Sequence, residues 1–248
     1  MTLDPAFLAR PIAHRGLHGA THGRAENSLG AVSAAIEAGF GIELDLQLTR
    51  DQKAVMFHDP TLDRLTDQSG LVAEKDADEL GSIRLGSTED TIVTLDMVLE
   101  RVAGRVPLLI ELKDQTERDG GVLGPLEQAT ADALSGYGGP VAVMSFHPGM
   151  VANLAQLAPE IPRGLTGTDF TTEDVAEPIA KRLNAYADFQ VTRSCFVSHD
   201  WHFLEMPAVS ELKAQGASIL CWTIRSPAEE IEARKIADNI TFEGYMPT

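Results

Sequence analysis

Residues 28–46 read SLGAVSAAIEAGFGIELDL, the pattern of one helix followed by one strand. Asn27 or Ser28 can cap the helix, because both side chains accept hydrogen bonds from the first free backbone amides. Gly39 is typical of the residue just past a helix, where the backbone turns left-handed. A strand follows over Gly41–Leu46, so the stretch predicts a helix joined to a strand by a short turn.

The same alternation continues along the chain. Strand character occurs in Pro11–His14, Gly41–Leu46, Ala54–His58, Pro107–Lys113, Val141–Ser145, Arg163–Leu165, Cys195–Ser198, Ser218–Thr223 and Asn239–Phe242. Helical spacing of apolar residues occurs in Ser28–Ala38, Leu95–Val102, Val122–Ser135, Gly149–Ala158, Glu173–Tyr186, Met206–Ala214 and Pro227–Lys235. Repeated strand–helix–strand units predict a mainly parallel sheet. About eight strands in about 250 residues fit a (β/α)8 TIM barrel better than an open doubly wound sheet.

Residues 59–94 interrupt the alternation. The segment is polar and rich in Asp, with glycines at 70, 81 and 86, so we expect an insertion after the third strand. Inserted loops of a barrel usually lie at its catalytic end. The chain has no low-complexity tract or linker-like stretch, and we therefore expect residues 1–248 to form a single domain.

The composition is that of a globular protein, with 44% hydrophobic and 23% charged residues among 248. A net charge of −17 argues against binding to nucleic acid, which needs clustered Lys and Arg. No segment approaches the roughly 18 apolar residues of a membrane span, and residues 1–11 lack the features of a signal peptide. Cys195 and Cys221 lie in apolar runs and are expected to be buried thiols. We expect a cytoplasmic protein with no stable membrane association.

Three carboxylates are candidate metal ligands. Glu43 and Asp45 are two residues apart on a strand, so they share one face, and the aliphatic residues between and around them share the other. If the apolar face packs under helices, both carboxylates point into the barrel, where they repel each other unless a cation intervenes. Glu111, on a more apolar strand, can complete the set. Three oxygen donors suit one hard divalent cation, Mg²⁺ or Ca²⁺. The alternative for Glu43 and Asp45 is an edge strand whose polar face lies in water. The alternative for Glu111 is an internal ion pair with Lys113.

Four further residues at strand ends can carry charge or protons. His14 and His58 end different strands, and histidine suits acid and base roles near neutral pH. Arg15 can clamp a phosphate with its planar guanidinium, and Lys113 can serve as a point charge for the same group. For each histidine the alternative is a structural role. Among the other histidines, His199 is a weaker candidate for the pocket.

Two aromatic residues also lie at strand ends. Phe146 follows the strand Val141–Ser145, and Trp222 lies near the end of Ser218–Thr223. Trp222 can form a wall for the apolar or cationic part of a substrate. The alternative for both residues is a place in the core.

These motifs together resemble the glycerophosphodiester phosphodiesterase family. The resemblance is carried, in order, by His14-Arg15-Gly16, Glu26-Asn27-Ser28, Glu43-Leu-Asp45, His58-Asp59, Leu62-Asp-Arg64-Leu-Thr66 and Glu111-Leu-Lys113. It covers most of the first 115 residues and resumes more weakly near Phe146, Trp222 and the C-terminal end. The family pattern often has Asn where this chain has Arg225, and Thr-Asp near its end, where this chain has Phe242-Glu243.

The resemblance implies a metal-dependent TIM barrel with an insertion after the third strand. It implies that Glu43, Asp45 and Glu111 bind the cation, and that His14 and His58 are the acid and the base. Arg15 and Lys113 would contact the phosphate.

The expected reaction is hydrolysis of a small glycerophosphodiester to glycerol 3-phosphate and an alcohol. We expect the glycerol 2-hydroxyl to attack phosphorus and form a cyclic 1,2-phosphate, which water then opens. The alternatives are a phosphodiesterase for a lysophospholipid or a sugar phosphodiester, a non-catalytic phospholigand-binding barrel, and an enolase-type proton-transfer enzyme. The sequence leaves open the alcohol, the native metal, the assignment of the two histidines and the oligomeric state.

Overall fold

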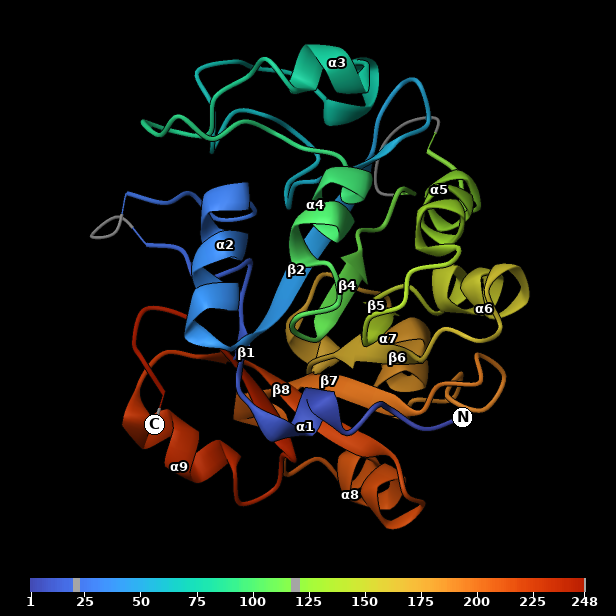
Figure 1. Ribbon diagram of the computed structural model, residues 1–248. Coiled ribbons are helices and arrows are strands. Elements are labelled where there is room, and N and C mark those ends of the chain that lie inside the picture. Colours follow the sequence, from blue (N-terminus) through green and yellow to red (C-terminus); the bar gives the residue numbers. More distant parts are fainter. Residues whose placement is uncertain (20–22, 117–120, 248) are drawn as a thin grey trace.

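Eight parallel strands close into a barrel in the computed structural model, which describes residues 1–19, 23–116 and 121–247 (Figure 1). The barrel strands are β1 (Ile12–Ala13), β2 (Gly41–Leu48), β4 (Leu108–Leu112), β5 (Val141–Ser145), β6 (Arg163–Gly167), β7 (Phe196–Asp200), β8 (Ser218–Ile224) and β9 (Asn239–Phe242). The short strand β1 closes the barrel because it pairs with both β2 and β9. The prediction of a TIM barrel is confirmed.

Helices surround the strands. They are α1 (Ala6–Ala9), α2 (Leu29–Ala38), α3 (Ala77–Leu80), α4 (Leu95–Val102), α5 (Pro125–Leu134), α6 (Pro148–Leu157), α7 (Glu177–Asn184), α8 (Pro207–Ala214) and α9 (Pro227–Ala233). Several begin later than the sequence predicts, because a proline occupies the first turn, where its missing N–H costs nothing. The capping prediction for α2 holds: Ser28 accepts a hydrogen bond from the amide of Ala31, and Gly39 ends the helix at φ 73°.

The strand β3 (Ala54–Met56) differs from its expected place. The sequence predicts a third barrel strand at Ala54–His58, but β3 is antiparallel to β2 and lies outside the closed barrel. Only five residues, 49–53, connect the two strands, which is the length of a hairpin loop and too short for a parallel crossover. The segment after β3 is nevertheless inserted as predicted, and it packs its own small apolar core around Leu62, Leu80 and Ile92.

The two faces of β2 have different surroundings. Ile42, Leu44 and Leu46 belong to the large apolar layer between strands and helices. The opposite face, which carries Glu43 and Asp45, points into the barrel. The alternating sequence predicts this arrangement. One face of β2 packs against the helices, and the other carries the charged residues of the cavity.

The interior of the barrel near the amino ends of the strands is filled by apolar side chains. Residues from α1 and the segment before it pack against inward-facing residues of the strands, which are Leu109, Ala142, Met144, Phe196 and Leu220. The amide of Asn239 donates hydrogen bonds to the backbone oxygens of Phe7 and Arg10 and holds this segment in place. The chemistry is therefore restricted to the carboxyl ends of the strands, as is usual for this fold.

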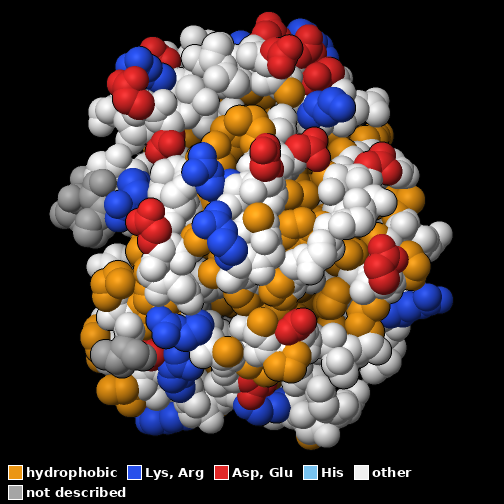
Figure 2. All heavy atoms as spheres, viewed as in Figure 1, with side chains coloured by type: hydrophobic (Ala, Val, Ile, Leu, Met, Phe, Trp, Pro, Cys, Tyr) orange, Lys and Arg blue, Asp and Glu red, His pale blue; other side chains and the backbone are white. Residues whose placement is uncertain are grey.

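The surface is mixed in character. On the face drawn in Figure 2, acidic and basic side chains are interspersed, with apolar side chains between them. Cys195 and Cys221 are free and buried, as expected. Within the described residues, no helix has both the length and the apolar character needed to cross a membrane.

Candidate active site

Three buried carboxylates meet at the carboxyl end of the barrel. Glu43 and Asp45 come from β2 and Glu111 from β4, and the register of these strands places Asp45 directly beside Glu111. Their side chains offer carboxylate oxygens that lie within 4.8 Å of one another. The residues are only 2%, 1% and 7% exposed, so water cannot screen their mutual repulsion.

This carboxylate set fits a divalent cation. Burial, together with the charges of Asp45 and Glu111, raises the pKa of Glu43 well above its ordinary value. A carboxylic acid in such surroundings holds a proton unless another positive charge replaces it. Converging buried oxygens are the donor set that Mg²⁺ and Ca²⁺ prefer. Glu43, Asp45 and Glu111 could therefore hold one such ion.

Lys113 extends from the end of β4 over the carboxylates. Its Nζ lies 2.7 Å from Glu111 Oε1 and 3.6 Å from Asp45 Oδ1. Burial lowers the pKa of Lys113, but these carboxylates outweigh burial and raise it above its ordinary value. Burial likewise raises the pKa of Asp45, but Lys113 and the other nearby cations outweigh it and bring the pKa to about 2. Lys113 therefore stays charged beside an ionised Asp45.

The loop after β1 brings Arg15 to the same place. Arg15 adopts a left-handed backbone with φ 54°, and its amide donates a hydrogen bond to Glu43. Its side chain reaches Asp45, at 3.3 Å, and Glu26, at 2.6 Å. Gly16 follows with φ 78°, and a Cβ there would lie 2.8 Å from the Cβ of Ala31, so only glycine allows this loop to approach α2 so closely.

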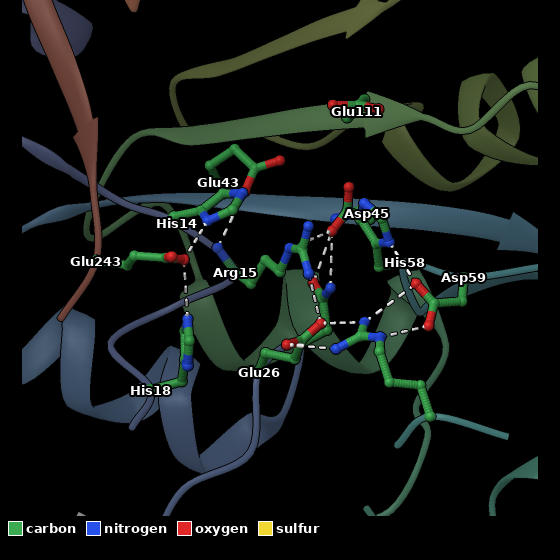
Figure 3. A network of polar contacts seen from close by, with 12 residues as sticks. His14, Arg15, His18, Glu26, Glu43, Asp45, His58, Asp59, Glu111 and Glu243 are labelled. Carbon is green, nitrogen blue, oxygen red and sulfur yellow. Dashed lines mark hydrogen bonds and ion pairs between the residues drawn. The ribbon is translucent and has the colours of Figure 1, made fainter. Parts of the chain in front are cut away.

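The two histidines of the prediction face the carboxylates from opposite sides (Figure 3). His14 Nε2 lies 3.9 Å from Glu43 Oε2, and its Nδ1 lies 2.6 Å from Glu243 Oε2. His58 Nε2 lies 3.2 Å from Lys113 Nζ. Burial lowers the pKa of His14, although the hydrogen bond to Glu243 opposes this effect.

His58 belongs to a local polar cluster, which we call the His58 group: His58, Asp59 and Arg64. His58 Nδ1 lies 2.6 Å from Asp59 Oδ1, and Arg64 Nε donates to Asp59 Oδ2 at 2.5 Å. Arg64 also donates two hydrogen bonds to Glu26, the residue that holds Arg15. Arg64 belongs to the insertion. The insertion is therefore linked to His58 through Asp59 and to Arg15 through Glu26.

All nine residues singled out from the sequence line one cavity of about 170 Å³. They are His14, Arg15, Glu43, Asp45, His58, Glu111, Lys113, Phe146 and Trp222. The rings of Phe146 and Trp222 pack edge to face with centroids 5.6 Å apart, and form an apolar wall of the cavity. The structure thus brings these residues together, and their roles in a reaction remain predictions.

Other hollows and histidines lie away from this cavity. A larger surface hollow of about 360 Å³ lies beside α2 and α4 and is lined by long surface side chains such as Met97 and Arg101. His199, the weaker candidate, does not line the charged cavity. Side chains alternate between the two faces of β7, and that of His199 lies on the outer face. There it is buried and contacts the hydroxyl of Tyr186.

Several residues of the site were not singled out from the sequence. Glu243 and Arg225 follow late strands of the barrel, and the rule that polar residues at strand ends are functional could have found both. His18 could not be found in this way, because it lies in a loop. His14, His18 and Glu243 also offer ligand atoms within 4.8 Å of one another. The 2.6 Å contact between His14 and Glu243 is a hydrogen-bond distance, and we assign it as such.

Known proteins resemble this chain over most of its length. The model of the Glycerophosphoryl diester phosphodiesterase family matches residues 14–240. The glycerophosphodiester phosphodiesterase of Caldanaerobacter subterraneus subsp. tengcongensis is 30% identical over 227 residues, which cover 86% of this chain and 84% of that protein.

Solved structures show the same fold. A phosphodiesterase from Oleispira antarctica, determined in complex with the product sn-glycerol-3-phosphate, superimposes with a TM-score of 0.78 at 24% identity and covers 96% of this chain and 94% of that one. The glycerophosphodiester phosphodiesterase of Thermotoga maritima gives a TM-score of 0.71 at 22% identity, with 94% of each chain covered. Because the family model spans nearly the whole chain, the resemblance seen in the sequence is confirmed, and the chain is an enzyme of the glycerophosphoryl diester phosphodiesterase family.

Proposed function

We propose that the chain hydrolyses glycerophosphodiesters to sn-glycerol 3-phosphate and an alcohol. The observation that carries this proposal is the set of three buried carboxylates between two histidines, each with Nδ1 bound to a further carboxylate. Such a histidine presents Nε2 to the cavity and can accept or donate a proton there. The similar Oleispira antarctica phosphodiesterase, solved with sn-glycerol-3-phosphate, supports this choice of product.

Glu43, Asp45 and Glu111 would hold the divalent cation, either Mg²⁺ or Ca²⁺. When bound, the ion would lower the pKa of a substrate hydroxyl and neutralise charge on the phosphate. Arg15 and Lys113 lie beside these carboxylates and would bind the phosphate oxygens, Arg15 through its planar guanidinium and Lys113 as a point charge.

The two histidines would move the protons. In the first step one histidine takes the proton of the glycerol 2-hydroxyl, and the hydroxyl oxygen attacks phosphorus. The bond between phosphorus and the alcohol oxygen breaks, and the other histidine donates a proton to that oxygen. The product of this step is glycerol 1,2-cyclic phosphate. Water then opens the ring with the two roles reversed.

The alcohol would leave past Phe146 and Trp222. Their edge-to-face wall lines the same cavity and can pack against an apolar or cationic alcohol. The same wall would also accept the apolar part of a lysophospholipid, so this is the alternative substrate class. We place the protein in the cytoplasm, where its two free thiols would stay reduced.

One experiment tests substrate and metal together. Purified protein is stripped of metal with EDTA, Mg²⁺ or Ca²⁺ is added back, and release of glycerol 3-phosphate is measured for a panel of glycerophosphodiesters and lysophospholipids. We expect EDTA to abolish turnover and either ion to restore it, with the water-soluble diesters cleaved best. Full activity of a preparation shown to be free of metal would refute the role of the carboxylates.

A second substrate tests the attacking group. Attack by the substrate's own hydroxyl gains up to about 7–11 kcal/mol from its fixed position near phosphorus. We therefore expect a 2-deoxyglycerol analogue to bind as a competitive inhibitor without being cleaved, and glycerol 1,2-cyclic phosphate to be hydrolysed. Cleavage of the deoxy analogue at the rate of its parent would show that water attacks phosphorus directly.

A further inference from the structure

Three consecutive strands of the barrel end in residues that contact one another. Arg225 is the first residue after β8, Glu243 the first after β9 and His14 the first after β1. We call them the His14 group. Glu243 Oε2 lies 2.6 Å from His14 Nδ1, and Glu243 Oε1 accepts hydrogen bonds from Arg225 Nε, at 2.8 Å, and lies 2.7 Å from its Nη2. Figure 3 shows Glu243 pointing at His14 from the neighbouring strand.

The strand register fixes this contact. Ala13 pairs with Phe242, and Phe242 pairs with Ile224, so the three residues that follow form a row across the rim of the barrel. Backbone hydrogen bonds continue the row: the amide of His14 donates to Phe242, and the amide of Glu243 donates to Ile224. The three side chains are thus placed by the strand pairing that closes the barrel.

We propose that Glu243 is a positioning residue for His14 and that Arg225 holds Glu243 in place. The proposal rests on the function proposed above, in which His14 moves a proton. Because Arg225 and Glu243 bind each other, the pair forms one unit at the rim of the barrel.

The chemistry of the pair explains how it would act. A carboxylate bound to a guanidinium stays ionised and can only accept hydrogen bonds, so His14 must carry its proton on Nδ1. The neutral ring then has its lone pair on Nε2, which faces the cavity near Glu43. Glu243 thereby fixes both the tautomer and the orientation of the ring, as the buried aspartate does for the histidine of serine proteases.

His18 contributes to the same arrangement. Its Nε2 lies 3.6 Å from Glu243 Oε2, whereas Arg225 binds the other oxygen, Oε1. The hydrogen bond from His14 and the nearby ring of His18 outweigh burial and lower the pKa of Glu243 far below its usual range. The carboxylate is therefore surrounded by donors and has little freedom to turn away from His14.

The test compares four variants. Glu243→Gln keeps the size of the side chain but removes the charge, Glu243→Asp keeps the charge, and Arg225→Met removes the guanidinium that holds Glu243. Glu232→Gln, an exposed carboxylate on α9 that pairs with Lys235, is the matched control. For each variant we would measure kcat and KM for a glycerophosphodiester with an alkyl alcohol, the affinity for Mg²⁺ and the melting temperature.

We expect Glu243→Gln to lower kcat by about 10- to 100-fold, the usual loss when an orienting partner is removed. KM and Mg²⁺ affinity should change little. Glu243→Asp should recover part of the loss, Arg225→Met should lose less than Glu243→Gln, and Glu232→Gln should match the wild type. A wild-type kcat for Glu243→Gln would overturn the proposal. A loss of Mg²⁺ affinity as large as the loss of kcat would also overturn it, because it would show that Glu243 acts on the three carboxylates expected to bind the metal.

A spectroscopic arm is independent of turnover. In protein labelled with ¹⁵N-histidine, the nitrogen shifts of His14, assigned by its loss in His14→Ala, report the tautomer directly. We expect the Nδ1–H form in the wild type and in Glu232→Gln, and a mixture of tautomers in Glu243→Gln. If the wild type cleaves none of the panel, the proposed function fails, and this spectrum still decides whether Glu243 sets the state of His14. An unchanged spectrum in a folded Glu243→Gln protein would refute the positioning role.

Discussion

The His14 group and the His58 group have the same chemistry and different origins. In both, Nδ1 of a histidine lies 2.6 Å from a carboxylate oxygen, and an arginine binds the same carboxylate. The members of the His58 group lie between positions 58 and 64 of the chain. The members of the His14 group come from positions 14, 225 and 243 and meet only because β8, β9 and β1 are neighbours. One side of the cavity is therefore encoded locally, and the other by closure of the barrel.

The two groups also differ in what surrounds them. Arg64 of the His58 group binds Glu26 as well as Asp59, and Glu26 binds Arg15. The His58 group is thus linked to the residue expected to bind phosphate. The His14 group has His18 as its additional neighbour, and its arginine, Arg225, shares no carboxylate with Arg15 among the described residues. Loss of the two arginines should therefore have different kinetic consequences.

The largest effects should follow removal of the histidines themselves. We expect His14→Ala and His58→Ala each to lower kcat by about 10²- to 10⁴-fold for an alkyl alcohol, the usual contribution of a positioned acid or base. Mg²⁺ affinity should be retained, because neither residue belongs to the carboxylate set. A histidine whose alanine variant keeps nearly wild-type kcat is structural.

The leaving group then separates the two histidines. p-Nitrophenolate departs without a proton, so a p-nitrophenyl diester should restore much of the rate of the first step, measured as release of p-nitrophenolate in a single turnover, in the variant that lacks the acid. It should not restore the variant that lacks the base. Recovery of exactly one variant assigns the roles, and recovery of both or neither would contradict a division of labour between the two groups.

The next effect concerns the carboxylate of the His58 group. We expect Asp59→Asn to lower kcat by about 10- to 100-fold, because the amide cannot hold His58 in one tautomer as the carboxylate does. Asp67→Asn, an exposed residue of the same insertion, is the control and should leave kcat unchanged. If Asp59→Asn retains full activity while Glu243→Gln does not, the similarity of the two groups is geometric only.

Most of the fold follows from patterns that are local in sequence. The alternation of β2 predicts which face carries Glu43 and Asp45, and the caps at Ser28 and Gly39 predict the ends of α2. The prediction that Ala54–His58 is a barrel strand is wrong, because a short apolar run has the same pattern in a hairpin and in a parallel strand. The tight loop before it was the signal for a hairpin.

The candidate site divides in the same way. Asp59 is adjacent to His58, so the sequence places the two together without any knowledge of the fold. Glu243 is 229 residues from His14, and its contact depends on the register between β1 and β9. The role of Arg64 depends on how the insertion folds back over Glu26, and a single sequence contains no pattern for that. Contacts set by closure or by an irregular loop are therefore the ones that sequence reasoning misses.

A smaller effect should distinguish the two arginines. An exposed ion pair contributes at most about 1 kcal/mol, which corresponds to about a fivefold change. Arg64→Met should raise KM and lower kcat, each by no more than about fivefold, because it releases both Glu26 and Asp59. Arg225→Met should lower kcat with little change in KM. Steady-state kinetics on one substrate give kcat and KM for each variant. If the two variants change kcat and KM in the same way, the two groups do not differ in their link to the phosphate site.

His199 offers a contrast, because its ring is not paired with a carboxylate. It is fully buried, its Nδ1 lies 2.6 Å from the Tyr186 hydroxyl, and its Nε2 has no hydrogen-bond partner among the described residues. Burial lowers the pKa of His199 to about 4, although the charges of Asp200 and Asp169 act in the opposite direction. The fold therefore holds this histidine neutral.

The smallest effect follows from that neutral ring and concerns stability. The unfolded chain takes up a proton at His199 near pH 6.5, whereas the folded chain does so only near pH 4. The free energy of unfolding should thus fall by up to about 1.4 kcal/mol per pH unit between these values, with no further loss from this residue below them. In His199→Gln this contribution is absent, and the amide can still bond to Tyr186. The variant should be less stable than the wild type at pH 7.5, and calorimetry at pH 7.5, 6 and 5 should show the difference shrinking as the pH falls. A constant difference across this range would mean that His199 has the same pKa in the folded and the unfolded chain, and that burial does not keep this histidine neutral.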